Sequence, residues 1–187
     1  MSEYFDFWDD KLVPGRWSLE DPYVNGHWVI PDLFTGAGGP KTLDGPIVVK
    51  VYRPGRPLDY TMAGRGMPVA SERAAQVFAR VAPDDVQIIP VTVEGHQEPY
   101  FIIHALHAIE CVDEARSEGI QWWTEADGRP ERIGDYSAVD VLRIEPARVA
   151  GHHLFRVKRW EVALIVSAHL RAELERANLT GLRFIPV

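Results

Sequence analysis

Residues 71–93 have the sequence SERAAQVFARVAPDDVQIIPVTV, in which a helix-forming segment is followed directly by an apolar, β-branched one. Four apolar residues repeat at the i, i+3, i+4, i+7 spacing of one helix face: Ala74, Val77, Phe78 and Val81. Ser71 precedes them and is a favourable N-cap, because its hydroxyl accepts a hydrogen bond from a first-turn N–H group. The segment predicts a helix from Ser71 to about Pro83, then a strand over 86–93.

The same pattern returns 96 residues later. Ser167 stands as far before the tripeptide IPV at 185–187 as Ser71 stands before IPV at 89–91. We therefore predict a second Ser-capped helix, with Gly181 as its left-handed C-cap. Two similar strand–helix–strand units are the simplest interpretation. β-Branched runs predict further strands at 100–106, 139–144, 153–157 and 162–166, with a closing strand at 182–187.

The 187 residues predict a single domain, 1–187, of the α+β class. We expect a mixed, largely antiparallel sheet with the two Ser-capped helices packed on it. Residues 31–68 hold six of the 14 prolines and seven of the 15 glycines. Apart from one strand at 47–52, this composition predicts an irregular N-terminal segment.

Charge and cysteine content narrow the function classes. The formal net charge is −7, which disfavours nucleic acid and anionic membranes as partners. A single cysteine, Cys111, excludes an intramolecular disulfide and a cysteine-rich zinc site. No apolar run reaches 18 residues, and the acidic N-terminus does not resemble a signal peptide. We expect a cytoplasmic protein.

A search for catalytic or metal chemistry yields no convincing site. His104, His107 and Cys111 are the best metal candidates, but a strand would turn His104 and His107 to opposite faces. His107 and Cys111 would lie about 13 Å apart at about 3.3 Å per residue. Carboxylates beside Cys111 would raise its thiol pKa, so we expect it to be a packing residue. We predict no metal and no cofactor.

Other motifs are equally weak. No serine stands in a G-x-S-x-G motif, and the glycine-rich stretch 36–42 has Pro40 where a phosphate loop needs glycine. His152 and His153 are adjacent, so in a strand at most one of them can line a given pocket. We therefore expect no enzymatic activity and no catalytic residues.

Residues 110–135 carry eight carboxylates against three arginines, so most of the net negative charge falls there, beside Trp122 and Trp123. Acidic surfaces with exposed aromatic residues suit binding to a basic protein. The alternative is a solvated loop whose tryptophans cover the core. The candidate partner-binding residues are Glu110, Asp113, Glu118, Trp122, Trp123, Glu125 and Asp127.

Several segments resemble one protein family. They are VASER at 69–73, IIPV at 88–91, Tyr100, ECVD at 110–113 with Ser117, LFR at 154–156, ALIVS at 163–167 and NLTGLRFIPV at 178–187. In these segments the chain resembles bacterial immunity proteins of polymorphic toxin systems, first catalogued as a domain of unknown function and typified by a myxobacterial member. The likeness covers residues 58–187, and residues 1–57 are only loosely similar.

The resemblance implies an α+β domain that binds and neutralises a cognate protein toxin, such as a nuclease. Our leading hypothesis is that it does so by occluding the toxin's active site. A nuclease toxin would be basic, which fits an acidic partner. Two alternatives stay open. One is a small-ligand-binding protein or hydrolase with His104, His107 or His152 lining a pocket. The other is an adaptor or chaperone for a secreted effector.

Overall fold

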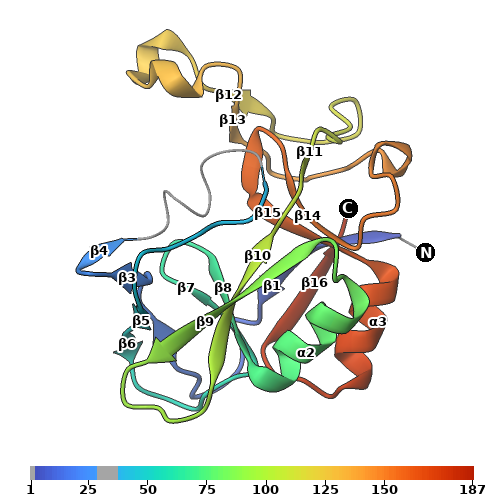
Figure 1. The fold of residues 1–187 in the computed structure, drawn as a ribbon. Coiled ribbons are helices and arrows are strands. Elements are labelled where there is room, and N and C mark those ends of the chain that lie inside the picture. The colour runs from blue at the N-terminus through green and yellow to red at the C-terminus, as the bar shows by residue number, and fades with distance from the viewer. Residues whose placement is uncertain (1–2, 29–37) are drawn as a thin grey trace.

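Two β-sheets dominate the computed structural model, which describes residues 3–28 and 38–187 (Figure 1). The seven-stranded sheet has the order β4 (His27–Trp28), β3 (Tyr23–Val24), β5 (Ile47–Val49), β9 (Val86–Val93), β10 (Tyr100–Ala105), β8 (Met67–Ser71) and β7 (Tyr60–Ala63). The five-stranded sheet has the order β11 (Ala108–Ile109), β14 (Leu154–Val157), β15 (Trp160–Ser167), β1 (Tyr4–Asp9) and β16 (Leu182–Pro186). The pairs β5–β9 and β11–β14 are parallel and the other pairs are antiparallel. The predicted α+β class with a mixed, largely antiparallel sheet is confirmed.

Both predicted helices are present, and each has the predicted serine as its N-cap. Helix α2 (Glu72–Val81) starts after Ser71, whose hydroxyl accepts the Ala74 N–H at 3.4 Å. Helix α3 (Ala168–Arg176) starts after Ser167, whose hydroxyl accepts the Leu170 N–H at 3.1 Å. Helix α2 lies against the seven-stranded sheet, α3 lies against the five-stranded sheet, and the two helices contact each other (Figure 1).

The predicted likeness of the two units extends to their topology. Helix α2 connects β8 to β9, and β10 runs antiparallel between those strands. Helix α3 connects β15 to β16, and β1 runs antiparallel between them. Each unit is thus a split β–α–β arrangement with one inserted strand. In the chain, β10 follows the unit into which it inserts, whereas β1 precedes its unit.

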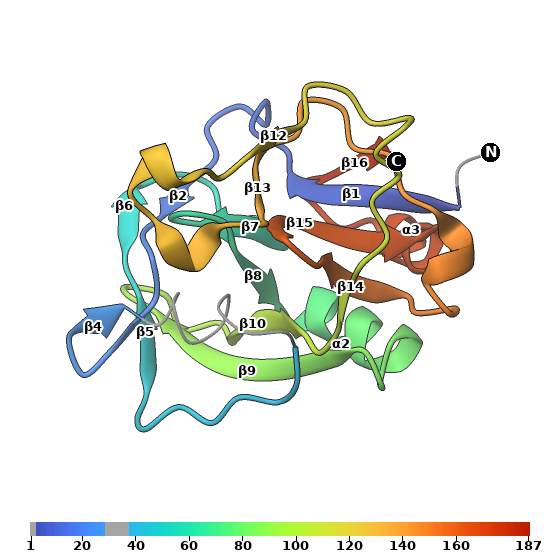
Figure 2. The ribbon, with the colours of Figure 1, turned by 90° about the horizontal axis from the view of Figure 1, so that it is seen from above.

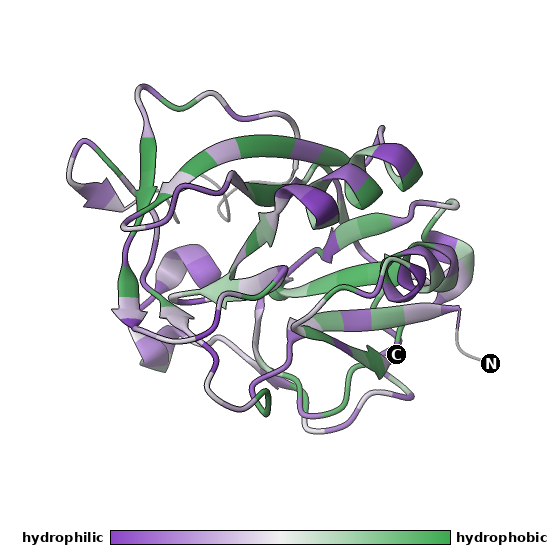
Figure 3. Cartoon of the chain, turned by 90° about the horizontal axis from the view of Figure 1, so that it is seen from below, coloured by the Kyte–Doolittle hydropathy of each residue, from purple (hydrophilic) through white to green (hydrophobic). Residues whose placement is uncertain are grey.

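One core joins the sheets and helices. Phe7 stacks on Tyr60 with ring centroids 4.2 Å apart, so β1 of one sheet meets β7 of the other. Phe78 of α2 and Leu174 of α3 are fully buried in the same cluster. Figure 2 shows the two sheets from above, and Figure 3 shows that the strands are mostly apolar while the helices carry polar outer faces. No helix in the described residues is long and apolar enough to cross a membrane.

Three sequence predictions about local structure are wrong. The stretch 31–68 holds more than the one predicted strand, because β7 lies within it and β8 begins at its end, and the sequence patterns do not predict β1, which precedes it. Residues 139–144 do not form a strand and make only isolated bridges, through Val141 and Ile144. Gly181 is not the C-cap of α3. The helix ends at Arg176, Asn178 adopts φ +49°, and Gly181 has φ +87° where a Cβ would lie 2.3 Å from the Tyr60 carbonyl oxygen.

Candidate partner-binding site

Residues 121–138, which we call the arm, extend away from the two sheets (Figure 1). The arm consists of β12 (Gln121–Trp122), two 3-10 turns η1 (Glu125–Asp127) and η2 (Pro130–Arg132), and β13 (Tyr136–Ala138), which pairs with β12. Neither turn contains a buried residue. Its shape therefore depends on local hydrogen bonds and on the packing at its base.

At the base, Trp122 packs on Tyr136 with ring centroids 4.4 Å apart. Tyr136 is buried, and its hydroxyl donates to Glu114 at 2.7 Å. The guanidinium of Arg159 lies 5.7 Å from the Trp122 ring and 5.5 Å from the Tyr136 ring. Trp122 covers Tyr136 but stays 38% exposed, so its position is fixed while part of its ring remains accessible.

At the tip, the Asp127 carboxylate accepts hydrogen bonds from the N–H and the hydroxyl of Thr124, both at 2.8 Å. These bonds lower the pKa of Asp127. Trp123 is half-buried between Arg129 and Arg132, whose guanidinium carbons lie 5.4 and 5.5 Å from its ring. Of the two tryptophans, Trp122 therefore offers the more accessible face.

The tertiary structure divides the predicted acidic segment into a neutralised part and a free part. Glu110 pairs with Lys158 and Arg159, which the sequence places almost fifty residues away. Asp113 pairs with Arg116 at 2.8 Å. These carboxylates therefore contribute little net field.

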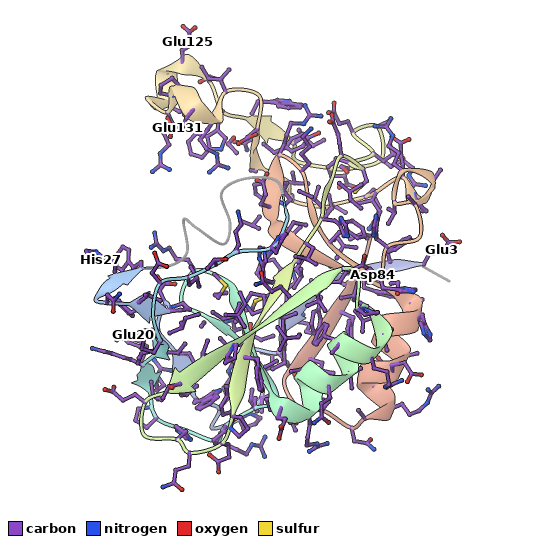
Figure 4. All side chains as sticks on the ribbon, viewed as in Figure 1. Glu3, Glu20, His27, Asp84, Glu125 and Glu131 are labelled. Atoms are coloured by element: carbon purple, nitrogen blue, oxygen red, sulfur yellow. The ribbon has the colours of Figure 1, made fainter. Side chains whose placement is uncertain are left out.

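Free negative charge lies farther out. Glu118, Glu125 and Glu131 are exposed, and none of them forms an ion pair with another residue that the structure describes. Figure 4 shows Glu125 and Glu131 on the arm, away from the sheets. The carboxylates of 110–135 without an ion pair thus include two on the arm and Glu118 shortly before it.

A hollow of about 250 Å³ lies beside the base of the arm. It is lined by carboxylates and cations together, and these polar groups include Glu110, Asp113, Glu114, Glu145, Arg148, Lys158 and Arg159. Glu110 and Asp113 of the predicted set line this hollow, while Trp122, Trp123, Glu125 and Asp127 lie on the arm. Sequence reasoning missed Tyr136 and Arg159, because only the folded chain brings them against Trp122.

The three histidines proposed to line a ligand pocket do not all lie together. His104 Nε2 lies 3.0 Å from the Gly39 carbonyl oxygen, and burial lowers its pKa. His107 and His152 meet each other beside Asp85, with ring centroids 4.0 Å apart. His153 faces Ser167 instead, with its Nδ1 2.8 Å from the hydroxyl, as expected for neighbours that point opposite ways.

The structure also bears on Cys111 and on the glycine-rich stretch 36–42. Cys111 is fully buried, and that burial raises its thiol pKa to about 12, so packing is its role. The glycine-rich stretch 36–42 begins outside the described residues. In its described part, the Gly39 and Lys41 N–H groups donate to Leu106 and Gln87, so they do not form a free phosphate cradle.

A sequence profile of the immunity protein family (Imm11) matches residues 6–187. The chain belongs to the Imm11 immunity protein family. The match includes most of β1 and the region that follows it, so the family domain is larger than the 58–187 region of clear likeness. No curated protein matches the chain. Membership supports an immunity function and makes a toxin the class of partner to consider for the arm.

Proposed function

We propose that this Imm11 protein binds a cognate bacterial protein toxin through the arm and the hollow at its base, and blocks the toxin's active site. Family membership over residues 6–187 carries the immunity function. The projecting arm, with exposed Glu125 and a partly exposed Trp122, supports the location. An anchored aromatic residue with acidic neighbours suits a hot spot surrounded by a steering field.

The toxin that fits this surface is basic, and a nuclease is the leading class. A nuclease binds phosphates in a positively charged groove. Carboxylates on an arm that enters the groove would occupy the positions of phosphates. A toxin of this class would act in the cytoplasm, which is where we place the immunity protein.

Co-expression tests the function. The protein encoded beside this chain is expressed in a susceptible bacterium with and without the immunity protein. Growth arrest by the neighbour that this chain alone relieves supports immunity. A neighbour that is harmless, or whose toxicity persists, contradicts it. If the chain is needed for secretion of the neighbour but not for survival, it is an adaptor and the proposal fails.

Charge reversal tests the location. The variant Glu118→Lys/Glu125→Lys removes two unpaired carboxylates without touching the Thr124 cap. We expect the association rate constant for the toxin to fall at least tenfold at low salt, and the loss to shrink as salt screens the field. The matched control is Glu94→Lys/Glu98→Lys, which changes the same charge on the exposed turn between β9 and β10. Equal association rates for both variants would place the interface elsewhere.

A further inference from the structure

Three residues from separate parts of the chain converge beside the junction of the two sheets. Asp85 immediately precedes β9, His107 follows β10, and His152 precedes β14. Asp85 Oδ1 lies 2.6 Å from His152 Nδ1 and 3.4 Å from His107 Nε2. One potential ligand atom from each residue lies within 4.8 Å of the other two.

The carboxylate is fixed by the backbone around it. Asp85 is 5% exposed, and its Oδ2 accepts the N–H groups of His153 at 2.6 Å and Leu154 at 3.3 Å. Its own N–H donates to the Ala82 carbonyl at 3.0 Å. The bonds from His153 and Leu154 occupy Oδ2 and leave Oδ1 facing the two imidazoles. Such outer hydrogen bonds are the usual means by which a protein orients a metal-ligating carboxylate.

The side chains of His107 and His152 are 35% and 31% exposed, so solvent reaches the cluster. Two imidazoles and one carboxylate form a donor set that suits zinc, with the fourth position left to water. Nitrogen donors favour a divalent transition metal over Mg²⁺ or Ca²⁺, which prefer oxygen. We propose that Asp85, His107 and His152 form a binding site for zinc or a similar divalent transition metal.

The two separations between Asp85 and the histidines need only a small adjustment. A zinc ion with bonds of about 2.0–2.1 Å holds tetrahedral neighbours about 3.3 Å apart. The Asp85–His107 separation of 3.4 Å already matches this value. The Asp85–His152 pair, at 2.6 Å, opens by less than an ångström when the ion replaces their hydrogen bond. His107 Nε2 must also leave the Asp84 carbonyl oxygen, now 3.1 Å away.

Metal binding would connect the two sheets. Asp85 leads into β9 of the seven-stranded sheet, and His152 leads into β14 of the five-stranded one. His107 lies between them in the chain, after β10 of the first sheet and directly before β11 of the second. The bound ion would thus add a cross-link between segments that backbone hydrogen bonds already hold together, such as the Arg156 N–H to the His107 carbonyl at 2.9 Å. The site therefore predicts stabilisation of the whole fold by the metal, whatever the toxin is.

Metal titration tests the site in the full-length chain, purified without a polyhistidine tag and stripped with a chelator. Calorimetry with ZnCl₂ should give one equivalent per chain. Co²⁺ should give the visible absorption of a low-symmetry site. The midpoint of thermal unfolding should rise by about 5 °C or more at a hundredfold excess of zinc over its dissociation constant. Tighter binding of Mg²⁺ than of Zn²⁺ would contradict the metal class.

His107→Gln and His152→Gln, each at a partly exposed position, should weaken zinc binding at least tenfold. The matched control is His27→Gln, an exposed histidine on the other side of the molecule from Asp84, the neighbour of Asp85 (Figure 4). Loss in both cluster variants with retention in the control supports the site. Absence of zinc binding by the wild-type chain, or equal binding by all variants, would overturn it and leave a hydrogen-bonded cluster.

Discussion

The carboxylate of Asp59 accepts hydrogen bonds from both the backbone N–H and the hydroxyl of Thr180, each at 2.9 Å. These residues are 121 positions apart in the chain. The other carboxylate oxygen accepts the Ser71 hydroxyl at 2.8 Å. Asp59 therefore ties the start of α2 to the loop that follows α3, and connects the two similar units of the fold.

Asp59→Ala should lower the free energy of unfolding by about 1–2 kcal/mol, the lower part of the range for charge-assisted bonds because the carboxylate is partly hydrated. Denaturant unfolding followed by circular dichroism measures this change. Asp44→Ala, at an exposed position, serves as the control. Equal stability of the two variants would show that the Thr180 and Ser71 bonds contribute nothing.

The stabilisation by Asp59 should depend on pH. Partial burial by itself raises the pKa of Asp59, but hydrogen bonds from Thr180 and Ser71, together with Arg73, outweigh burial and lower the pKa below 3.8. A lowered folded-state pKa means that the contribution is complete above the unfolded pKa and is lost as pH falls through the folded one. The stability gap between wild type and Asp59→Ala should therefore persist at pH 6 and narrow below about pH 4. A gap that widens on acidification would contradict the lowered pKa.

The thiol of Cys111 should resist modification in the folded protein. Burial is the largest cause of its raised pKa of about 12, with Glu145 adding to it and Arg148 opposing it. At pH 8 the thiolate is therefore scarce and shielded. A chromogenic disulfide reagent should label less than a tenth of the chains natively and all of them in guanidinium. Rapid native labelling would show that the 111 region opens.

The cap of α3 should contribute more to stability than an ordinary surface serine. Ser167 is buried, and its hydroxyl accepts the Leu170 N–H while lying 2.8 Å from His153 Nδ1. Ser167→Ala should cost about 1–2 kcal/mol in unfolding free energy. Ser137→Ala, on β13 of the arm, should cost less than about 0.5 kcal/mol. Equal costs would mean that the cap is not stabilising.

Trp122 should be the energetic centre of the toxin interface if the arm binds as proposed. Trp122→Ala removes the partly exposed ring that packs on Tyr136 and should weaken toxin binding by about 2 kcal/mol or more, which is roughly thirtyfold. Trp28→Ala is the control, because Trp28 is also exposed but lies on β4, outside the arm. An unchanged dissociation constant for Trp122→Ala would move the hot spot off the arm.

Local patterns in the sequence predicted both helices and the strands β9, β10, β14, β15 and β16, but not β1, β7 or β8. Ser71 and Ser167 were recognisable as caps because capping involves atoms only three residues apart. Strand β1 was missed although its residues alternate between buried and half-buried. Its signal is short and acidic at Asp6 and Asp9, whereas the pairing with β15 and β16 that fixes it spans almost the whole chain.

Patterns within some twenty residues were enough to predict the two Ser-capped helices and the α+β class, and short segments spread over 58–187 carried the family likeness. Which carboxylates stay unpaired, by contrast, depends on contacts that form only in the folded chain. The charge of Glu110 is neutralised by ion pairs with Lys158 and Arg159, whereas Glu125 forms no ion pair with a described residue. Only the fold brought Asp85 to His107 and His152. Electrostatic and ligand contacts act over a few ångströms in space, whatever the separation of the residues along the chain, so the sequence alone does not reveal them.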